Sequence, residues 1–118
     1  MILITDSMRA KGLSDGSYTL AGQLVKVKGQ KATLEDGTLA GSVLKMNEAL
    51  ARMKRISSWS MEELIKISSK NAAKRLGVYD RKGSIAVGKD ADIVLINDSF
   101  EVFYTFCKGG LSFSYEAE

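Results

Sequence analysis

The sequence contains no histidine and no proline, and Cys107 is its only cysteine. One cysteine cannot build a disulfide framework, and zinc sites made from Cys/His clusters need several of these residues. The Ser-His-Asp and Cys-His catalytic arrangements are excluded because both need a histidine. No apolar stretch approaches the roughly 18 residues of a membrane-spanning helix, and no signal-peptide pattern begins the chain. We therefore expect a cytoplasmic protein without a membrane partner.

The charge distribution offers nucleic acid little to bind. The net charge is only +3, from 17 basic and 14 acidic residues. The one local basic group is Arg52, Lys54 and Arg55. On a helix these three would not all share one face, because only residues three or four apart do. A solvated helix end explains the group, so we expect no nucleic-acid partner.

The first segment, Met1–Thr5, is a short apolar run that ends abruptly at Asp6. An unbroken run without alternation predicts a strand buried on both faces, as in parallel sheets. Such a strand needs neighbours, and nothing before it in the chain supplies them. We therefore expect the sequence to be the C-terminal part of a longer protein.

Short β segments follow. Residues 17–20, 23–27 and 31–34 alternate between Gly-containing turns and predict an antiparallel meander. Residues 37–42 predict a loop bracketed by two glycines. The last third of the chain is β-rich again, with strands expected over residues 91–96, 101–107 and 111–115. Cys107, in an apolar strand, is expected to be a small buried side chain.

Between these β segments the apolar residues recur at the three- and four-residue spacing of a helix. Residues 43–55 predict one helix, and Ser60 begins a second through a capping box with Glu63. Asn71 is expected to cap a short third helix that Gly77 ends. The helical side chains expected in the core are Met46, Leu50, Met53, Leu64 and Ile65.

Three stretches resemble one enzyme family. Residues 4–8 (Ile-Thr-Asp-Ser-Met) are similar to the end of the last barrel strand of N-acetylglucosamine-6-phosphate deacetylases, members of the amidohydrolase superfamily. Residues 37–42 (Gly-Thr-Leu-Ala-Gly-Ser) resemble a loop of the same family. Residues within 69–94 resemble a C-terminal signature common to many amidohydrolases. The chain departs from the family at Ala72 and Val87, where proline is usual.

This resemblance implies an α/β fragment: the last strand and flanking helices of a (β/α)8 metal-dependent hydrolase barrel, plus part of the small β-sandwich domain. Residues 1–76 would form the C-terminal end of the barrel, with a β-meander insertion at about 14–36. Residues 77–118 would form the C-terminal strands of the small β-domain. The implied activity is hydrolysis of N-acetylglucosamine 6-phosphate to glucosamine 6-phosphate and acetate, in amino-sugar catabolism. The isolated chain is expected to be inactive.

The resemblance assigns site residues to the first two stretches. Asp6 matches the family aspartate that takes a proton from the attacking water and passes it to the leaving amine. Taken without the family, an aspartate after a strand is more often a turn residue or a helix N-cap. Leu39, Ala40 and Gly41 match positions that border the sugar, where glycine lets the backbone approach a ligand. An ordinary turn into a helix is the alternative for this segment.

The family's metal ligands are a glutamate and histidines on earlier strands. This chain is therefore expected to hold no metal, whereas the complete enzyme would use a divalent metal, zinc or iron. The partner of the complete enzyme would be the sugar-phosphate substrate. The isolated chain is expected to associate with a second copy of itself, because its first strand and helix stripes lack the surfaces they would cover. The competing hypothesis is a freestanding, non-enzymatic β-rich module that binds itself or another partner.

Overall fold

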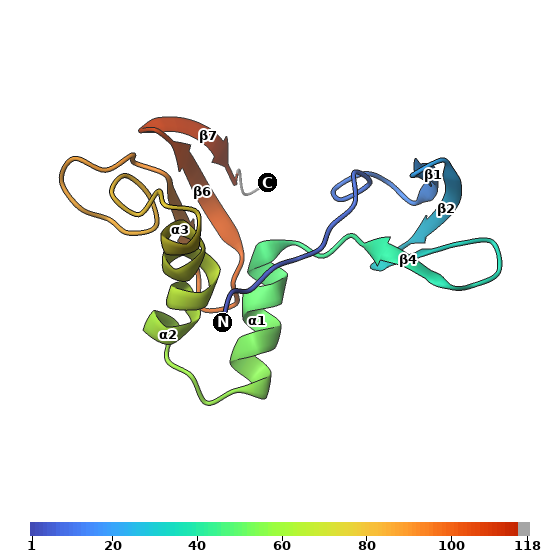
Figure 1. Ribbon diagram of the computed structural model, residues 1–118, viewed down its shortest axis with the longest axis horizontal. Coiled ribbons are helices and arrows are strands. Elements are labelled where there is room, and N and C mark those ends of the chain that lie inside the picture. The colour runs from blue at the N-terminus through green and yellow to red at the C-terminus, as the bar shows by residue number, and fades with distance from the viewer. Residues whose placement is uncertain (116–118) are drawn as a thin grey trace. The chain divides into compact units, whose positions relative to one another are not determined.

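The structure, a computed structural model, describes residues 1–115, and its chain divides into two compact units (Figure 1). Residues 4–49 form the meander unit. Residues 1–3, together with the chain from Leu50 onward, form the helix–sheet unit. Each unit has its own cluster of buried apolar side chains. Within residues 1–115, no helix is long and apolar enough to cross a lipid bilayer.

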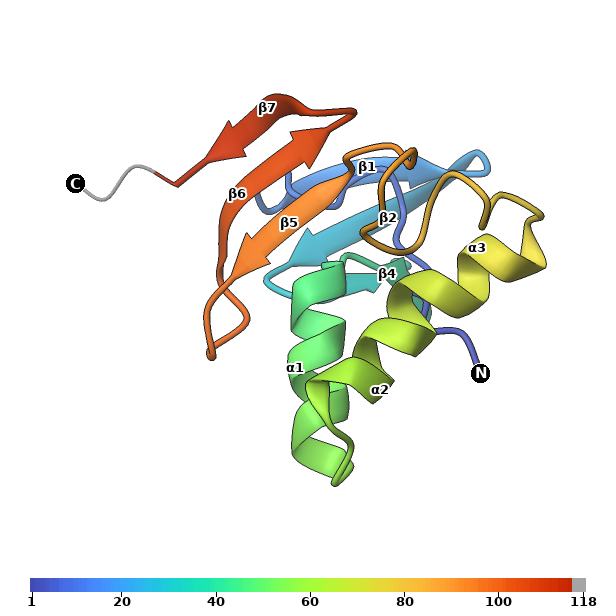
Figure 2. The same cartoon turned by 90° about the vertical axis from the view of Figure 1, so that its left-hand side faces the viewer.

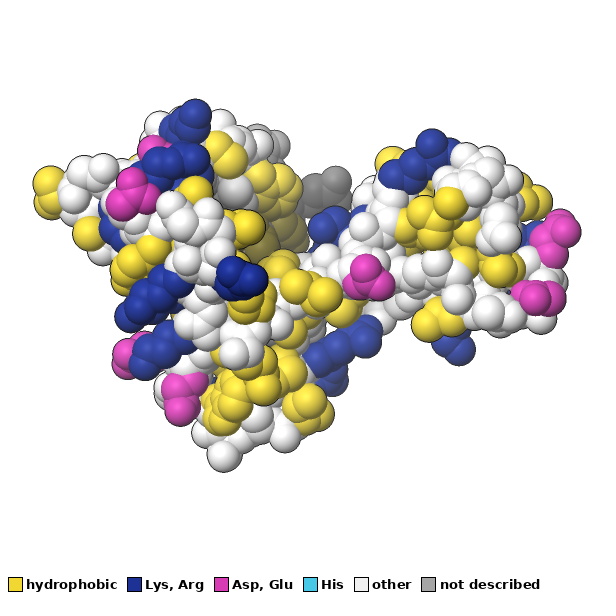
Figure 3. Space-filling view, viewed as in Figure 1, with side chains coloured by type: hydrophobic (Ala, Val, Ile, Leu, Met, Phe, Trp, Pro, Cys, Tyr) yellow, Lys and Arg dark blue, Asp and Glu magenta, His cyan; other side chains and the backbone are white. Residues whose placement is uncertain are grey.

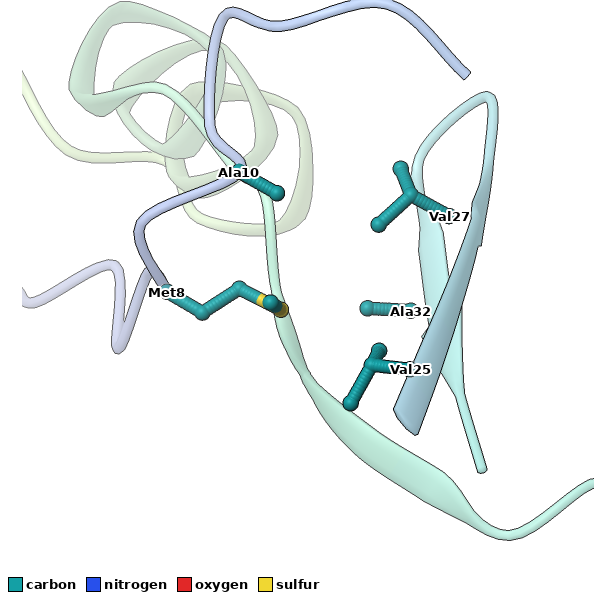
Figure 4. Packing of buried hydrophobic residues seen from close by; sticks show 5 residues of the cluster. All are labelled: Met8, Ala10, Val25, Val27 and Ala32. Atoms are coloured by element: carbon teal, nitrogen blue, oxygen red, sulfur yellow. The ribbon is translucent and has the colours of Figure 1, made fainter. Parts of the chain in front are cut away.

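The meander unit is a four-stranded antiparallel sheet in the order β1-β2-β3-β4. Its strands are β1 (Gly16–Leu20), β2 (Gln23–Lys28), β3 (Lys31–Thr33) and β4 (Leu39–Ser42). This sheet confirms the predicted meander. The alternating sequence pattern predicted it because every second side chain along a strand points to the same face. One cluster of buried apolar side chains packs together against that face (Figure 4); its members are Met8, Ala10, Val25, Val27 and Ala32.

Two expectations for the first part of the chain are wrong. Residues 39–42 form strand β4 rather than a loop, because their backbone pairs with β3. Residues 1–5 form no strand: the Leu3 N–H donates to the Ile67 carbonyl at 2.9 Å, and Ile4 is 68% exposed. A strand needs a neighbour for its backbone groups, and within residues 1–115 no strand pairs with this segment.

The predicted helix boundaries are largely correct. Helix α1 spans Met46–Ile56. The capping box is confirmed: the Glu63 N–H donates to the Ser60 hydroxyl at 3.2 Å, and the Ser60 N–H donates to the Glu63 carboxylate at 2.7 Å. Three helical segments then follow without a break (Figure 2). They are α2 (Met61–Ile65), the π-helical turn η1 (Lys66–Lys70) and α3 (Asn71–Arg75).

The expected helix cap at Asn71 is wrong. Asn71 has helical backbone angles, φ −68° and ψ −38°, and its side chain donates to the Met1 carbonyl at 2.8 Å. The helix runs through this position because residue 72 is alanine. A proline there would disfavour the helical conformation of the residue before it. Gly77 ends the helix with a φ of 68°, as predicted.

A second core lies in the helix–sheet unit. Its buried members are Leu50, Leu64, Ile67 and Phe100. Leu50 and Leu64 were expected there, and Met53 packs against the cluster. Ile65 is 41% exposed, so its predicted burial is wrong. It lies about 100° around the helix from Leu64, whereas Ile67, three residues along, shares the inner face.

The last part of the chain is a three-stranded antiparallel sheet in the order β5-β6-β7. The strands are β5 (Ile93–Ile96), β6 (Val102–Cys107) and β7 (Gly110–Ser114), close to the predicted ranges. Cys107 is exposed rather than buried. It pairs with Gly110 at the hairpin end of β6.

The stretch that resembles the amidohydrolase signature is held by an ion network. The Lys82 ammonium pairs with Asp90 at 2.8 Å and also with Asp92. Asp92 accepts a hydrogen bond from the Lys108 N–H at 2.9 Å. Lys82 therefore ties the loop before β5 together, and Asp92 ties that loop to the β6–β7 hairpin.

Gly83 lets the same loop approach the helix. Its φ is 82°, and a Cβ built on it would lie 2.5 Å from the Ala73 Cβ and 3.3 Å from the Ser69 carbonyl oxygen. Real side chains do not approach so closely. Glycine is therefore required at this position for both its backbone angle and its missing side chain.

Replacing Gly83 by alanine should destabilise the protein more than replacing Gly88. Both glycines have positive φ, 82° and 86°, so each variant carries a backbone cost of about 1–2 kcal/mol. Only Gly83→Ala also forces a methyl group against Ala73, which adds about 1–3 kcal/mol. Gly88 has nothing within 4 Å of its Cβ position. Urea unfolding measures both free energies, and equal losses would contradict the close approach.

The ion network should be visible in carboxyl pKa values. Hydrogen bonds from Lys82 hold the pKa of Asp90 and Asp92 below the ordinary value of an aspartate. Lys82→Met should raise both pKa values. Arg81→Met should raise only that of Asp90, with which Arg81 pairs at 3.0 Å. An NMR titration of the side-chain carboxyl carbons measures each residue, and a shift at Asp92 in the Arg81 variant would argue against this network.

The sign of the pH effect follows from these depressed values. A carboxylate whose folded-state pKa is lowered stabilises the fold above its unfolded-state pKa. This contribution is lost as the pH falls through the folded-state value. The network around Lys82 should therefore weaken below a pH of about 4.

Candidate active site

Asp6 lies exposed in the meander unit, just before the segment that packs on the sheet. Its φ is 50°. This left-handed conformation is uncommon for residues other than glycine, although aspartate adopts it more readily than most. Strained residues of this kind gather at functional sites, where the surrounding structure holds them in place. Ala21, Phe100 and Lys108 share this conformation, so the backbone of Asp6 does not by itself mark a functional residue.

The residues after Asp6 pair with the end of β4. Ser7 and Ser42 form a parallel bridge, and the Met8 N–H donates to the Ser42 carbonyl at 2.8 Å. The Ser7 hydroxyl also donates to the Leu44 carbonyl at 2.6 Å. These contacts bring the segment that carries Asp6 beside the strand that carries the three predicted sugar contacts.

The predicted sugar contacts Leu39, Ala40 and Gly41 form most of β4. Thr33 pairs with Leu39 and Ala32 with Gly41, so Ala40 is the extra residue of a β-bulge. A bulged residue is left out of the ladder, and bulges are common beside active sites. Leu39 is 73% exposed. The strand thus offers a solvent-facing side chain and a backbone segment outside regular pairing.

Sequence reasoning missed the part that Ser7 and Ser42 play. Each side chain bonds the backbone near Leu44: Ser7 donates to its carbonyl, and Ser42 accepts from its N–H at 3.0 Å. Serine commonly makes such local backbone bonds in place of regular pairing. The sequence signal that could have indicated these contacts is a serine directly after Asp6 and another directly after Gly41.

Comparison with known proteins identifies the family. The model of the amidohydrolase family matches residues 9–111, which is most of the chain. The chain belongs to the amidohydrolase family. It is 55% identical over its full length to the N-acetylglucosamine-6-phosphate deacetylase of Bacillus subtilis, and it spans 30% of that protein.

Solved structures agree with this assignment. The chain matches a crystal structure of N-acetylglucosamine-6-phosphate deacetylase from Thermotoga maritima with a TM-score of 0.85 and 42% identity, covering 98% of this chain and 31% of that one. It also matches an aspartate-to-alanine mutant of the Mycobacterium smegmatis deacetylase in complex with N-acetyl-D-glucosamine-6-phosphate. That match has a TM-score of 0.82 and 25% identity, over 93% of this chain and 30% of that one.

The amidohydrolase family is generally metal-dependent, but the side chains described in this structure do not form a metal site. Within residues 1–115, no group of three or more His, Cys, Asp or Glu side chains lies close enough together to hold an ion. Asp6 would be one carboxylate without companions. The side chains described within residues 1–115 therefore do not fit a metal ion by themselves.

Gly41→Ala should leave the meander unit intact. A Cβ at Gly41 would meet the Met8 Sδ at 3.6 Å, an ordinary contact, and Gly41 has no positive φ. Because alanine is favoured over glycine in strands by about 0.5–1 kcal/mol, the variant should unfold at equal or slightly higher denaturant. Gly37→Ala is the control: its φ of 84° should make that variant less stable by about 1–2 kcal/mol. A marked loss for Gly41→Ala would mean that β4 packs differently.

Proposed function

We propose that this chain is the C-terminal part of an N-acetylglucosamine-6-phosphate deacetylase, which hydrolyses the sugar phosphate to glucosamine 6-phosphate and acetate. The observation that carries the proposal is the pairing of Ser7 and Met8 with Ser42. It joins the predicted proton-transfer residue to the predicted sugar-binding strand in one unit. The identity to deacetylases of the same activity supports the choice of substrate.

In the complete protein, residues 1–76 would be the C-terminal end of the barrel, with the meander inserted at about 14–36. Met1–Thr5 would then gain the neighbouring strands that residues 1–115 do not supply. Residues 77–118 would contribute the C-terminal strands of the small β-domain. A cytoplasmic location, expected from the sequence, stays a prediction.

Asp6 would move the proton in amide hydrolysis. Its carboxylate accepts a proton from the water whose oxygen bonds to the acetyl carbon. The protonated carboxyl then donates that proton to the sugar nitrogen as the C–N bond breaks, which releases acetate and the free amine. One group can serve both steps because it ends the cycle in the state in which it began. The zinc or iron expected from the family would need ligands from outside this chain.

The strand β4 would border the sugar ring. Leu39 is exposed enough to pack on an apolar ring face, and the bulge at Ala40 frees backbone groups for sugar hydroxyls. Gly41 would allow the close approach of the ligand to the backbone. In the complete protein, Gly41→Ala should therefore raise KM several-fold while leaving the fold intact.

Asp6→Asn in the complete protein should lower kcat by several orders of magnitude, because an amide cannot accept the proton from water. Acetate release from N-acetylglucosamine 6-phosphate measures the rate, and elemental analysis should show unchanged metal content. Asp15→Asn, also exposed and in the meander unit, is the matched control and should retain full turnover. A kcat of the Asp6→Asn variant within about tenfold of that of the unmodified protein would contradict the assignment of Asp6 as the proton-transfer residue.

We also propose that the isolated chain associates with itself. Several large apolar side chains around the β5–β7 sheet are exposed, among them Val94 (54%), Phe113 (48%) and Tyr115 (55%). Within residues 1–115, β5 and β7 each pair on one side only. Open edges and uncovered apolar side chains favour pairing with another chain.

Sedimentation velocity at micromolar concentration should show a dimer or larger assembly of the isolated chain. Phe113→Ser, which reduces the exposed apolar surface, should shift the population towards monomer. Ser112→Thr, at the neighbouring exposed position, is the control and should leave it unchanged. A monodisperse monomer that unfolds cooperatively would favour the freestanding module over the fragment.

A further inference from the structure

Three lysine side chains surround one tyrosine ring in the helix–sheet unit. Their Nζ atoms lie 5.8 Å (Lys70), 5.2 Å (Lys74) and 3.8 Å (Lys89) from the centre of the Tyr79 ring. Lys70 ends η1, Lys74 lies in the last turn of α3, and Lys89 comes from the loop before β5. We call this group the lysine cage. It gathers cations from two segments of the chain around one aromatic side chain.

The loop geometry builds the lysine cage. Gly83 approaches the helix closely enough that its Cβ position lies 3.5 Å from the Lys70 Cα. That approach brings the loop, with Tyr79 and Lys89, against the helix that carries the other two lysines. The Lys89 ammonium donates to the Tyr79 carbonyl, which anchors it. The cage is therefore a product of the fold rather than a chance meeting of surface side chains.

The three cage lysines take part in none of the ion pairs among the described residues. Those pairs join carboxylates to Lys66, Arg81 and Lys82. The negative face of an aromatic ring attracts cations, but this attraction is modest at exposed sites. Three like charges within about one Debye length (~10 Å at 0.1 M salt) repel one another. A multivalent anion would relieve that repulsion.

Tyr79 responds to the same field. A hydrogen bond from Ser84, followed by the charges of the three lysines, lowers the pKa of its hydroxyl. The phenolic oxygen of Tyr79 thus lies where negative charge is favoured. Figure 3 shows dark blue Lys and Arg side chains over α3 and the loops that follow it. Magenta Asp and Glu side chains lie among them in the same view.

We propose that the lysine cage binds a compact polyphosphate anion. Ammonium groups form strong, charge-assisted hydrogen bonds with phosphate oxygens, and three of them match an anion that carries several such oxygens. Lys89, 3.8 Å from the ring centre, already covers one ring face. A nucleotide base could not stack on that covered face of the ring. The cage would therefore recognise the phosphate groups of a ligand. The lysine cage contains no residue of the proposed active site, and anion binding there does not depend on the proposed deacetylase activity.

The test is a titration of the 118-residue chain with inorganic pyrophosphate at constant ionic strength, monitored by the amide chemical shifts in NMR spectra. The amides of Tyr79, Ser84 and Lys89 should shift together and saturate. Lys74→Gln and Lys89→Gln should each weaken binding at least fivefold. Lys26→Gln removes the same charge from an exposed position of β2 and should change affinity by less than twofold.

Two variants of Tyr79 distinguish a contribution of the aromatic ring to anion binding from the effect of the lysine charges alone. Tyr79→Phe keeps the ring and should retain binding within about threefold, whereas Tyr79→Leu removes it and should weaken binding at least fivefold. The amide spectrum of each variant reports whether it is folded. If Lys89→Gln disturbs the fold, Lys74→Gln, at an exposed position, decides the matter. Equal weakening by Lys26→Gln and the cage variants, or shifts that never saturate, would overturn the proposal.

Discussion

The hydrogen bond from the Met8 N–H to the Ser42 carbonyl holds together two segments that the sequence keeps far apart. The predicted site depends on it, because Asp6 precedes one segment and Leu39–Gly41 the other. The Ser7 hydroxyl reinforces this junction through the Leu44 carbonyl. On the other side, Met8 is buried in the core of the meander. Backbone pairing and apolar packing therefore fix the same short segment, and rigid support of this kind is what a positioned catalytic group needs.

The helix–sheet unit depends on a different constraint, the close approach of Gly83 to α3. The approach carries the signature-like loop onto the helix, and Lys82 secures that loop through Asp90 and Asp92. The part of the sequence that resembles an amidohydrolase signature thus shapes the structure here. Its glycines and charged residues shape a loop, and the same loop assembles the lysine cage. A motif shared by a family is therefore not in itself a catalytic motif.

Local interactions were predictable from the sequence. The Ser60 capping box, the helix end at Gly77 and the alternation of β2 each depend on residues a few positions apart, and each is found in the structure. Such features follow from hydrogen bonding within one turn or from side-chain alternation along one strand. They need no knowledge of the rest of the chain.

Features that depend on distant partners were not predictable in this way. Residues 1–5 have strand-like composition, but no strand among residues 1–115 pairs with them. Residues 39–42 look like a loop, yet β3 supplies their backbone partners. Asn71 has the composition of a cap, but its amide bonds the Met1 carbonyl. The roles of Asp6 and of Leu39–Gly41 came from family resemblance, because an isolated aspartate or glycine is compatible with an ordinary turn.

The central claim is that Asp6 and β4 face the same bound sugar. The most direct measurement is a crystal structure of the complete protein carrying Asp6→Ala, soaked with N-acetylglucosamine 6-phosphate. The account predicts that the acetamido group lies beside residue 6, within reach of the missing carboxylate, and that the sugar ring contacts Leu39, Ala40 or Gly41. A sugar phosphate bound elsewhere, with residue 6 and β4 both facing solvent, would contradict it.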